Sequence, residues 1–181
     1  MIILKKDFEI GDLLLINFIN LNSVEKDLVR KWRNHKDVRK WMYQDHIISF
    51  EEHAVFIEKL KEENKNFYWL VKNKNGEYLG VIYLNKVDFL HKHAYLGIYS
   101  NPELKGVGKF LVQALKELAF KIAKFHTLKL EVIEANKHAI EFYKKQGFKK
   151  EGKLKEFVYK NGEWLDVIVM GGWGKGIVDS V

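Results

Sequence analysis

The chain has 181 residues, of which 47% are hydrophobic and 14% aromatic, a length that supports one sizeable hydrophobic core and therefore a single domain. Its lack of cysteine excludes a disulfide scaffold, a thiolate metal site and a cysteine nucleophile, and the absence of a long apolar run or signal-peptide layout predicts a cytoplasmic protein. The net charge of +7 permits anionic partners but does not choose among nucleic acid, a membrane surface and a phosphorylated small molecule, since the lysines are scattered among acidic residues.

The first 64 residues predict one strand followed by three helices. Ser23 is positioned to cap the first helix. Ser49 and Glu52 have the spacing of a capping box at the start of the third helix. We expect the apolar face of that helix to consist of Ala54, Ile57 and Leu60. The predicted strand covers residues 13–18, and the predicted helices cover residues 24–32, 38–42 and 50–64.

An antiparallel meander follows these helices. Residues 67–72 and 78–87 are rich in aromatic and β-branched side chains, which favour strands. The pair Asn75-Gly76 between them is typical of a tight hairpin turn. Residues 94–100 form the third predicted strand of the meander.

A glycine-rich turn follows the meander and opens a helix. Residues 103–109 read Glu-Leu-Lys-Gly-Val-Gly-Lys, and the helix after them carries one apolar stripe. Backbone N–H groups freed at the glycines and the positive end of the helix would converge on one point. Such a point suits a phosphate or pyrophosphate. The stripe consists of Leu111, Ala114, Leu115, Leu118, Ala119 and Ile122.

The last third of the chain repeats the alternation of strand and helix and ends in a hairpin. Asn136 is positioned to cap a short helix that bears Ala139, Ile140 and Tyr143, and Gly147 suits its left-handed end. The predicted strands cover residues 128–133, 149–159 and 164–170.

These elements predict the α/β class, with an α+β mixed sheet and helices on both faces. The sheet is mostly antiparallel, because only strands 94–100 and 128–133 are joined by a right-handed crossover that makes them parallel. We expect a single domain over residues 1–181, with a core at about 8–171 and a tail of little pattern at 172–181.

Two motifs resemble those of the GNAT N-acetyltransferase superfamily, whose members transfer an acetyl group from acetyl-coenzyme A to an amine. Residues 99–108 look like its strand and pyrophosphate loop, and residues 131–148 look like its second cofactor motif. The register of the loop stays open, since either Glu103 or Lys105 fits its first position. The resemblance implies the GNAT fold with a splayed parallel pair, acetyl-CoA as co-substrate and no metal. The implied cofactor contacts are Ile98, Tyr99, Ser100, Leu104, Lys105, Gly106, Val107, Gly108, Lys109 and Asn136.

A closer resemblance covers residues 32–157. This stretch is similar to the N-acetyltransferases of pseudaminic acid biosynthesis, which acetylate the 4-amino group of a UDP-linked 4-amino-4,6-dideoxy sugar on the route to flagellin glycosylation. Residues 89–99, which include His91-Lys92-His93, are the most specific part of the match. The resemblance implies a UDP-amino sugar as substrate. It also implies that Arg33, Met42, Tyr43 and His53 bind this sugar nucleotide.

The catalytic assignment rests on one tyrosine. Tyr143 matches the tyrosine that many superfamily members use as general acid, whereas its helical spacing alone also fits a core aromatic. The general base stays unassigned, because Glu131 and Glu134 on the adjoining strand could act through water but their positions favour surface or packing roles. His91 and His93 lack a third metal ligand of convincing spacing, so we expect no metal site.

Other functions stay open at this point. A protein N-terminal acetyltransferase of the ribosomal-protein type would share the cofactor half but would need an open acidic groove. A coenzyme A sensor without activity would not need Tyr143. A nucleic-acid-binding module is supported by net charge alone, so we expect neither a nucleic-acid nor a membrane partner. The sequence leaves the oligomeric state undecided, with a homodimer among the options.

Overall fold

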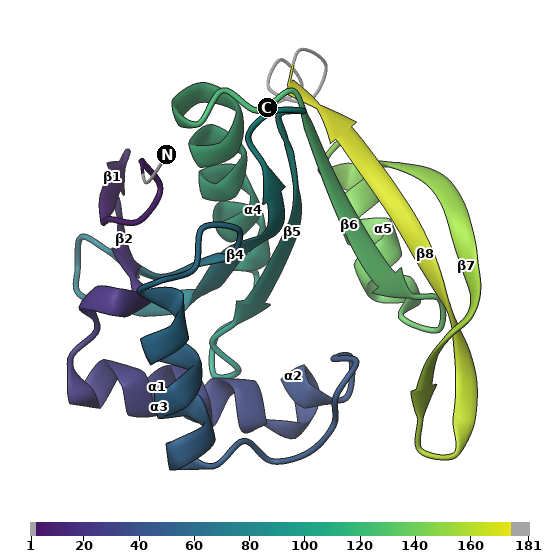
Figure 1. Ribbon diagram of the computed structural model, residues 1–181, viewed down its shortest axis with the longest axis horizontal. Coiled ribbons are helices and arrows are strands. Elements are labelled where there is room, and N and C mark those ends of the chain that lie inside the picture. The colour runs from purple at the N-terminus through teal and green to yellow at the C-terminus, as the bar shows by residue number, and fades with distance from the viewer. Residues whose placement is uncertain (1–2, 175–181) are drawn as a thin grey trace.

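The structure, a computed structural model, describes residues 3–174 and is built on one sheet of eight strands. The strand order is β1-β2-β3-β4-β5-β6-β8-β7, and only the pair β5 and β6 is parallel (Figure 1). The strands are β1 (Phe8–Ile10), β2 (Leu13–Asn17), β3 (Phe67–Asn73), β4 (Tyr78–Asp88), β5 (His93–Ser100), β6 (Thr127–Ile133), β7 (Lys149–Lys160) and β8 (Glu163–Trp173).

Helices cover both faces of this sheet. Short 3₁₀ and π-helical turns, Phe18–Asn20 and Glu117–Ile122, follow β2 and α4 respectively. Within residues 3–174, no helix is long and apolar enough to span a membrane. The α-helices are α1 (Ser23–Asn34), α2 (Lys36–Arg39), α3 (Phe50–Leu60), α4 (Gly108–Lys116) and α5 (Lys137–Lys145).

The alternation of side chains along the strands divides the hydrophobic core into two clusters. On β3, Trp69 and Val71 point toward the face covered by α4 and α5, whereas Leu70 points toward the face covered by α1 and α3. Both clusters consist of buried apolar side chains, which supply the main driving force for folding. The predicted mixed sheet with helices on both faces is therefore confirmed.

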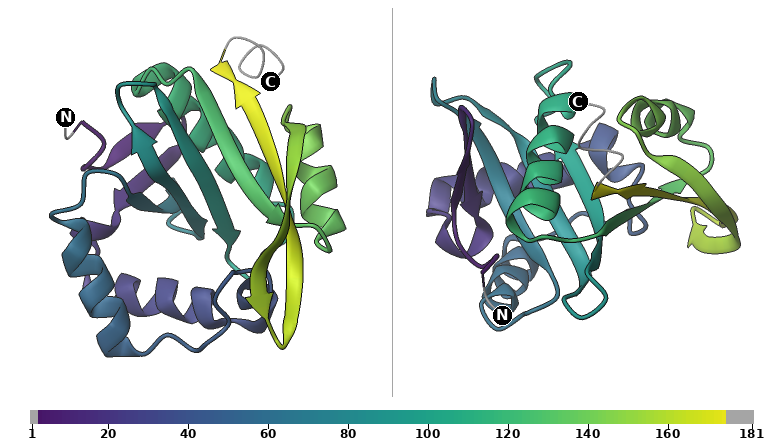
Figure 2. Two further views of the ribbon diagram at one scale, coloured as in Figure 1. Left: turned by 45° about the vertical axis from the view of Figure 1, so that its right-hand side comes forward. Right: turned by 90° about the horizontal axis from the view of Figure 1, so that it is seen from above.

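The parallel pair of strands opens soon after it forms. β5 and β6 pair only from His93 with Thr127 to Tyr95 with Lys129. Beyond these residues each strand keeps its other neighbour, β5 with β4 and β6 with β8, so the two halves of the sheet diverge (Figure 2, left). The predicted splay is confirmed, and α2 lies beneath the opening (Figure 1).

Several predicted helix details were wrong. Asn22, not Ser23, caps α1, because its Oδ1 accepts a hydrogen bond from the Glu25 N–H at 2.8 Å and Glu25 Oε1 accepts one from the Asn22 N–H at 3.0 Å. The short helix covers Lys36–Arg39 rather than residues 38–42. On α3, Ala54 is exposed and His53 takes its place beside Ile57 and Leu60.

The boundaries of other elements also differ from the prediction. The helix α3 ends at Leu60 rather than near Asn64. Strand β1 was missed because it is only Phe8–Ile10 and depends on pairing with β2. Strand β8 runs to Trp173, into the predicted tail, and the remainder of that tail from residue 175 lies outside the described residues.

Candidate active site

Two cavities meet at the opening between β5 and β6. The first has a volume of about 630 Å³ and extends from the opening to the N-terminus of α4. The second has a volume of about 600 Å³ and extends toward α1 and α3. A molecule in one cavity can therefore contact a molecule in the other at the side chains that line both. These shared residues are Trp41, Met42, Tyr83, Leu96, Tyr99 and Glu131.

The first cavity contains an unoccupied set of backbone donors at the start of α4. Val107, the N-cap residue, provides no side-chain cap. Within residues 3–174, nothing accepts a hydrogen bond from the N–H groups of Gly106, Gly108 and Lys109. Gly106 adopts a φ of 73°, which favours glycine and turns the chain into the helix. These donors and the positive end of the helix fit a pyrophosphate.

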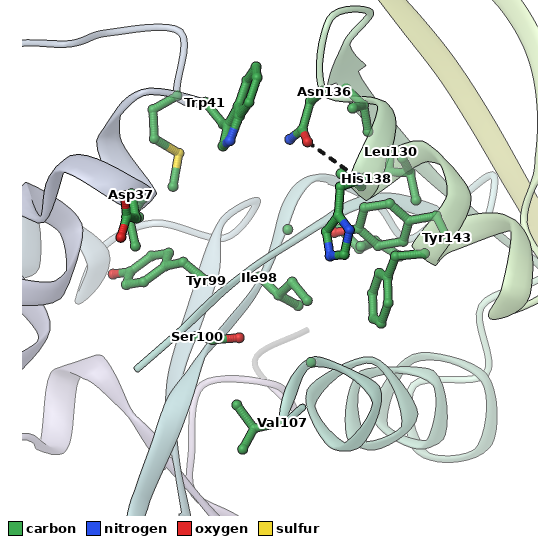
Figure 3. A pocket seen from close by; sticks show the side chains of 18 of the residues that line it. Asp37, Trp41, Ile98, Tyr99, Ser100, Val107, Leu130, Asn136, His138 and Tyr143 are labelled. Atoms are coloured by element: carbon green, nitrogen blue, oxygen red, sulfur yellow. Dashed lines mark hydrogen bonds between the residues drawn. The ribbon is translucent and has the colours of Figure 1, made fainter. Parts of the chain in front are cut away.

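Gly108 brings α4 close to α5. A Cβ atom added to Gly108 would lie 3.3 Å from Phe142 Cζ, which is tighter than an ordinary van der Waals contact. The glycine therefore lets the N-terminus of α4 approach the helix that carries Tyr143, as Figure 3 shows from close by.

Most of the predicted cofactor residues surround this cavity. Lys105 is the exception, because it is exposed and does not line the cavity. Beyond Tyr95, β5 has no strand partner on the side of β6, so alternate backbone N–H and C=O groups of residues 96–100 face the cavity. The predicted residues that do line it are Ile98, Tyr99, Ser100, Leu104, Gly106, Val107, Gly108, Lys109 and Asn136.

Tyr143 lines the first cavity from α5. Its side chain is 8% exposed, and its ring packs against Phe142 and Phe148 at centroid distances of 5.2 and 5.9 Å. Burial raises the pKa of the Tyr143 hydroxyl above its usual value, so the phenol stays protonated near neutral pH. Asn136 caps the same helix by accepting a hydrogen bond from the Ala139 N–H at 3.2 Å (Figure 3).

The four predicted substrate residues all line the second cavity: Arg33, Met42, Tyr43 and His53. Arg33 Nη2 donates to the carbonyl of Gln44 at 3.3 Å, and Arg33 Nη1 is buried without a hydrogen-bond partner among residues 3–174. An unpaired buried donor is costly, and an anionic ligand in this cavity would relieve that cost.

His53 is a neutral imidazole in this cavity. Burial lowers its pKa to about 4, and the positive charges of Arg30 and Lys26 act in the same direction. At neutral pH one ring nitrogen is therefore free to accept a hydrogen bond.

A hydrogen bond at the opening joins the segment after α2 to strand β6. The Tyr43 hydroxyl donates to Glu131 Oε1 at 2.6 Å. Burial, followed by the neighbouring Glu131 carboxylate, raises the pKa of Tyr43. Glu131 lines both cavities, whereas Glu134 forms an ion pair with Lys153 at 2.7 Å. Of the two carboxylates considered from the sequence, only Glu131 thus lies where the cavities meet.

Sequence reasoning missed a group of aromatic side chains at the same place. Tyr83 lines both cavities and stacks on Tyr68 at a centroid distance of 4.7 Å. Gly97 is its partner on β5, and a Cβ atom there would overlap the Tyr83 ring. Tyrosines in strands are typical of sheet packing, so Tyr83 itself gives no signal in the sequence. Only its pairing with a glycine, which leaves room for the ring, could have indicated its place.

The two histidines considered as metal ligands lie apart from this site. His91 and His93 have ring centroids 6.4 Å apart, and neither lines the two cavities. In the part of the chain that the structure describes, no group of three or more His, Cys, Asp or Glu side chains is placed to hold a metal ion.

Comparisons with known proteins point to one family. Residues 22–169 match the family described as an acetyltransferase (GNAT) domain. The chain is 39% identical over 145 residues to acetyltransferase PseH of Campylobacter jejuni, covering 80% of this chain and 90% of the relative. It is 27% identical over 154 residues to spermidine N(1)-acetyltransferase of Vibrio cholerae, covering 82% and 89% of the two chains.

Solved structures of the same two kinds of protein share the fold. The crystal structure of Campylobacter jejuni N-acetyltransferase PseH has a TM-score of 0.71 at 29% identity, covering 90% of this chain and 99% of the other. Spermidine N-acetyltransferase from Vibrio cholerae, in complex with CoA and spermine, has a TM-score of 0.84 at 23% identity, covering 93% and 99%. The second likeness is one of fold alone.

Proposed function

Because the chain belongs to the GNAT acetyltransferase family, as an N-acetyltransferase that uses acetyl-CoA as co-substrate, we propose that it acetylates the 4-amino group of a UDP-linked 4-amino-4,6-dideoxy-N-acetyl sugar in pseudaminic acid biosynthesis. The observation that carries this proposal is the 39% identity to acetyltransferase PseH over 80% of the chain. It agrees with the resemblance found in residues 32–157, and the second cavity offers a place for the sugar nucleotide.

The cofactor side of the proposed site is the first cavity. Acetyl-CoA supplies an activated acetyl thioester when bound. The N–H groups of Gly106 to Lys109 would hold its pyrophosphate, and the unpaired edge of β5 around Ile98 would hold its pantetheine arm together with Asn136. Tyr143, buried and protonated, would give a proton to the departing thiolate.

The acceptor side is the second cavity. Arg33 Nη1 is free to bind the diphosphate, and His53 is a neutral acceptor for a hydroxyl group. Tyr43 and Met42 would contact the sugar nucleotide where the cavities meet. We assign Glu131 as the carboxylate that takes the amine proton, directly or through water, because it lines both cavities.

The hydrogen-bond partners of the charged groups in the second cavity favour an anionic acceptor over a polyamine, because Arg33 Nη1 has no partner among residues 3–174 whereas the carboxylates do. Arg33 and Lys86 line this cavity and would repel a polycation. The two carboxylates that also line it already have partners, since Glu52 is bound to His46 at 2.7 Å and Glu131 accepts the Tyr43 hydroxyl at 2.6 Å. The 27% identical spermidine acetyltransferase therefore supplies a useful comparison substrate rather than the expected one.

One experiment tests the proposed function. The purified protein is incubated with acetyl-CoA and, in separate reactions, with the UDP-4-amino-4,6-dideoxy-N-acetyl sugar, spermidine, or a peptide with a free N-terminus. Of these three reactions, we expect only the one with the sugar to release free thiol and to give a product with the added mass of one acetyl group. Transfer to spermidine or to the peptide, without transfer to the sugar, would refute the proposed acceptor and leave the acetyltransferase activity intact.

Two further parts of the proposal concern the protein as a whole. We propose that it acts in the cytoplasm and that it forms a homodimer. Light scattering of the purified protein tests the proposed homodimer, because it gives the mass of the particle in solution and a single chain has a mass of 21.4 kDa.

A further inference from the structure

A buried lysine from the C-terminal hairpin is bound to the end of α2. Lys160, the last residue of β7, is 7% exposed. Its Nζ atom donates hydrogen bonds to the carbonyls of Arg39 at 3.2 Å, Lys40 at 2.6 Å and Met42 at 2.6 Å. An ammonium group has three protons, so these three bonds satisfy it completely. The carbonyls at a helix C-terminus lack partners within the helix and attract a cation.

Two of the carbonyls bound by Lys160, those of Lys40 and Met42, belong to a segment that forms the wall between the two cavities. We call residues 40–43 the bridge segment. Within it, Trp41 and Met42 line both cavities, and Tyr43 lines the second. The bridge segment is 120 residues from Lys160 in sequence, yet it lies beside the end of the β7–β8 hairpin (Figure 2, left).

Two more contacts tie the bridge segment to the same half of the sheet. The Tyr43 hydroxyl donates to Glu131 on β6. The Tyr43 ring meets Phe157 of β7 edge to face at a centroid distance of 6.3 Å. These contacts hold the Tyr43 side chain, whereas Lys160 binds the backbone carbonyls of Lys40 and Met42, on either side of Trp41.

We propose that Lys160 is a positioning residue for acetyl transfer, which holds the bridge segment so that Trp41 and Met42 orient the acceptor amine where the two cavities meet. Lys160 lines neither cavity, so it acts through these residues rather than by contact with substrate. The inference rests on the proposed transferase activity. A displacement of about 1 Å in a positioning group can cost about 10²-fold in rate, so a loosened bridge segment has a measurable effect.

The test compares two lysines of β7. Lys160→Met removes the ammonium while keeping an unbranched side chain of similar length. Lys155→Met makes the same change of charge on an exposed residue of the same strand. For Lys160→Met we expect the kcat/KM for the acceptor to fall about tenfold or more, with a loss in kcat because the amine is no longer oriented, while the KM for acetyl-CoA stays within about twofold. For Lys155→Met we expect both constants to match the wild type.

Hydrogen exchange supplies a second measurement that needs no acceptor. We expect the amides of the bridge segment to exchange faster in Lys160→Met than in Lys155→Met, with equal affinity for coenzyme A in both. Lys160→Gln, which keeps a polar donor, replaces Lys160→Met if that variant does not fold. Equal exchange in the two variants would overturn the proposal. Faster exchange with an unchanged kcat/KM for the acceptor would also overturn it, since Lys160 would then serve stability alone.

These measurements separate the inference from the proposed function. If the UDP-amino sugar is not acetylated by the wild type, the proposed acceptor is wrong, and the acceptor that does support thiol release takes its place in the kinetic comparison. The hydrogen-exchange result keeps its meaning in either case.

Discussion

The hydroxyl group of Tyr143 is the group on which catalysis depends most directly in the proposed mechanism. Because burial keeps this phenol protonated, we expect Tyr143→Phe to lower kcat by about 10²-fold or more, the usual contribution of a general acid. The ring remains packed against Phe148, so the affinity for coenzyme A should stay within about threefold. Single-turnover kinetics and calorimetric titration measure the two effects.

A matched control for this variant is Tyr159→Phe, which removes a hydroxyl from an exposed tyrosine of the C-terminal hairpin. It should leave turnover unchanged. Equal turnover in Tyr143→Phe and the wild type would show that the phenol has no chemical role and that Tyr143 is a packing residue.

His53 makes the stability of the protein depend on pH. Its pKa is lowered to about 4 in the folded chain, against about 6.5 in an unfolded one. Between these values the unfolded chain binds a proton that the folded chain does not, so the free energy of unfolding falls as the pH falls through this window. We expect His53→Gln to lose less stability than the wild type between pH 7 and about pH 4.5.

Urea unfolding midpoints at the two pH values measure this difference, and the exposed His138→Gln serves as the control. If His53→Gln and the wild type lose the same free energy on acidification, the imidazole is not buried as a neutral group, and its assignment as a hydrogen-bond acceptor in the second cavity fails with it.

At the scale of elements, α5 combines a structural cap with a proposed cofactor contact in one residue. The Asn136 side chain accepts the Ala139 N–H and also lines the first cavity. We expect Asn136→Ala to lose about 1 kcal/mol of stability, typical of a removed N-cap, and to bind coenzyme A more weakly. Asn136→Asp keeps the accepting oxygen but loses the amide donor, so we expect it to retain stability and still bind coenzyme A more weakly.

Thermal unfolding and calorimetric titration of both variants separate the two roles. If Asn136→Asp binds coenzyme A as well as the wild type does, the residue acts through the helix alone and the proposed pantetheine contact is wrong.

Elements whose signals are local could be predicted from the sequence. Asn136 caps α5 as expected, and Gly147 adopts the left-handed φ of 95° that its place at the helix end requires. Both outcomes depend on residues within one turn. The cap of α1 was misplaced by one residue because Asn22 and Ser23 are both good cap residues, and the choice depends on which side chain reaches the N–H and carboxylate of Glu25.

At the scale of the whole molecule, the features missed were those that depend on pairing between distant segments. Tyr83 occupies the opening because the register of β4 and β5 places it opposite Gly97, and no pattern within either strand fixes that register. Lys160 reaches α2 through a contact that spans 120 residues. In the sequence, no local pattern distinguishes Lys160 from the other lysines. The residues implied by the resemblance, Lys105 apart, line the two cavities, and their roles stay predictions; Tyr83, which lines both cavities, was not among them.

The arrangement of the two cavities leads to a prediction about the order of events. The cavities share Tyr83, Tyr99 and Glu131 at the opening, so an acetyl donor and an acceptor can be bound together and react directly. The chain has no cysteine. Among the described residues, no histidine or carboxylate side chain forms a hydrogen bond with Ser100, the serine that lines the first cavity, so this serine is not activated as a nucleophile.

We therefore expect sequential kinetics. When acetyl-CoA is varied at several fixed concentrations of the acceptor, double-reciprocal plots should intersect, and coenzyme A should inhibit competitively against acetyl-CoA. Each substrate alone should bind to the enzyme without release of free thiol above the rate of spontaneous hydrolysis. Parallel plots, together with an acetylated enzyme detected by mass spectrometry, would mean that the acetyl group passes through the protein, and the direct transfer inferred from the joined cavities would be wrong.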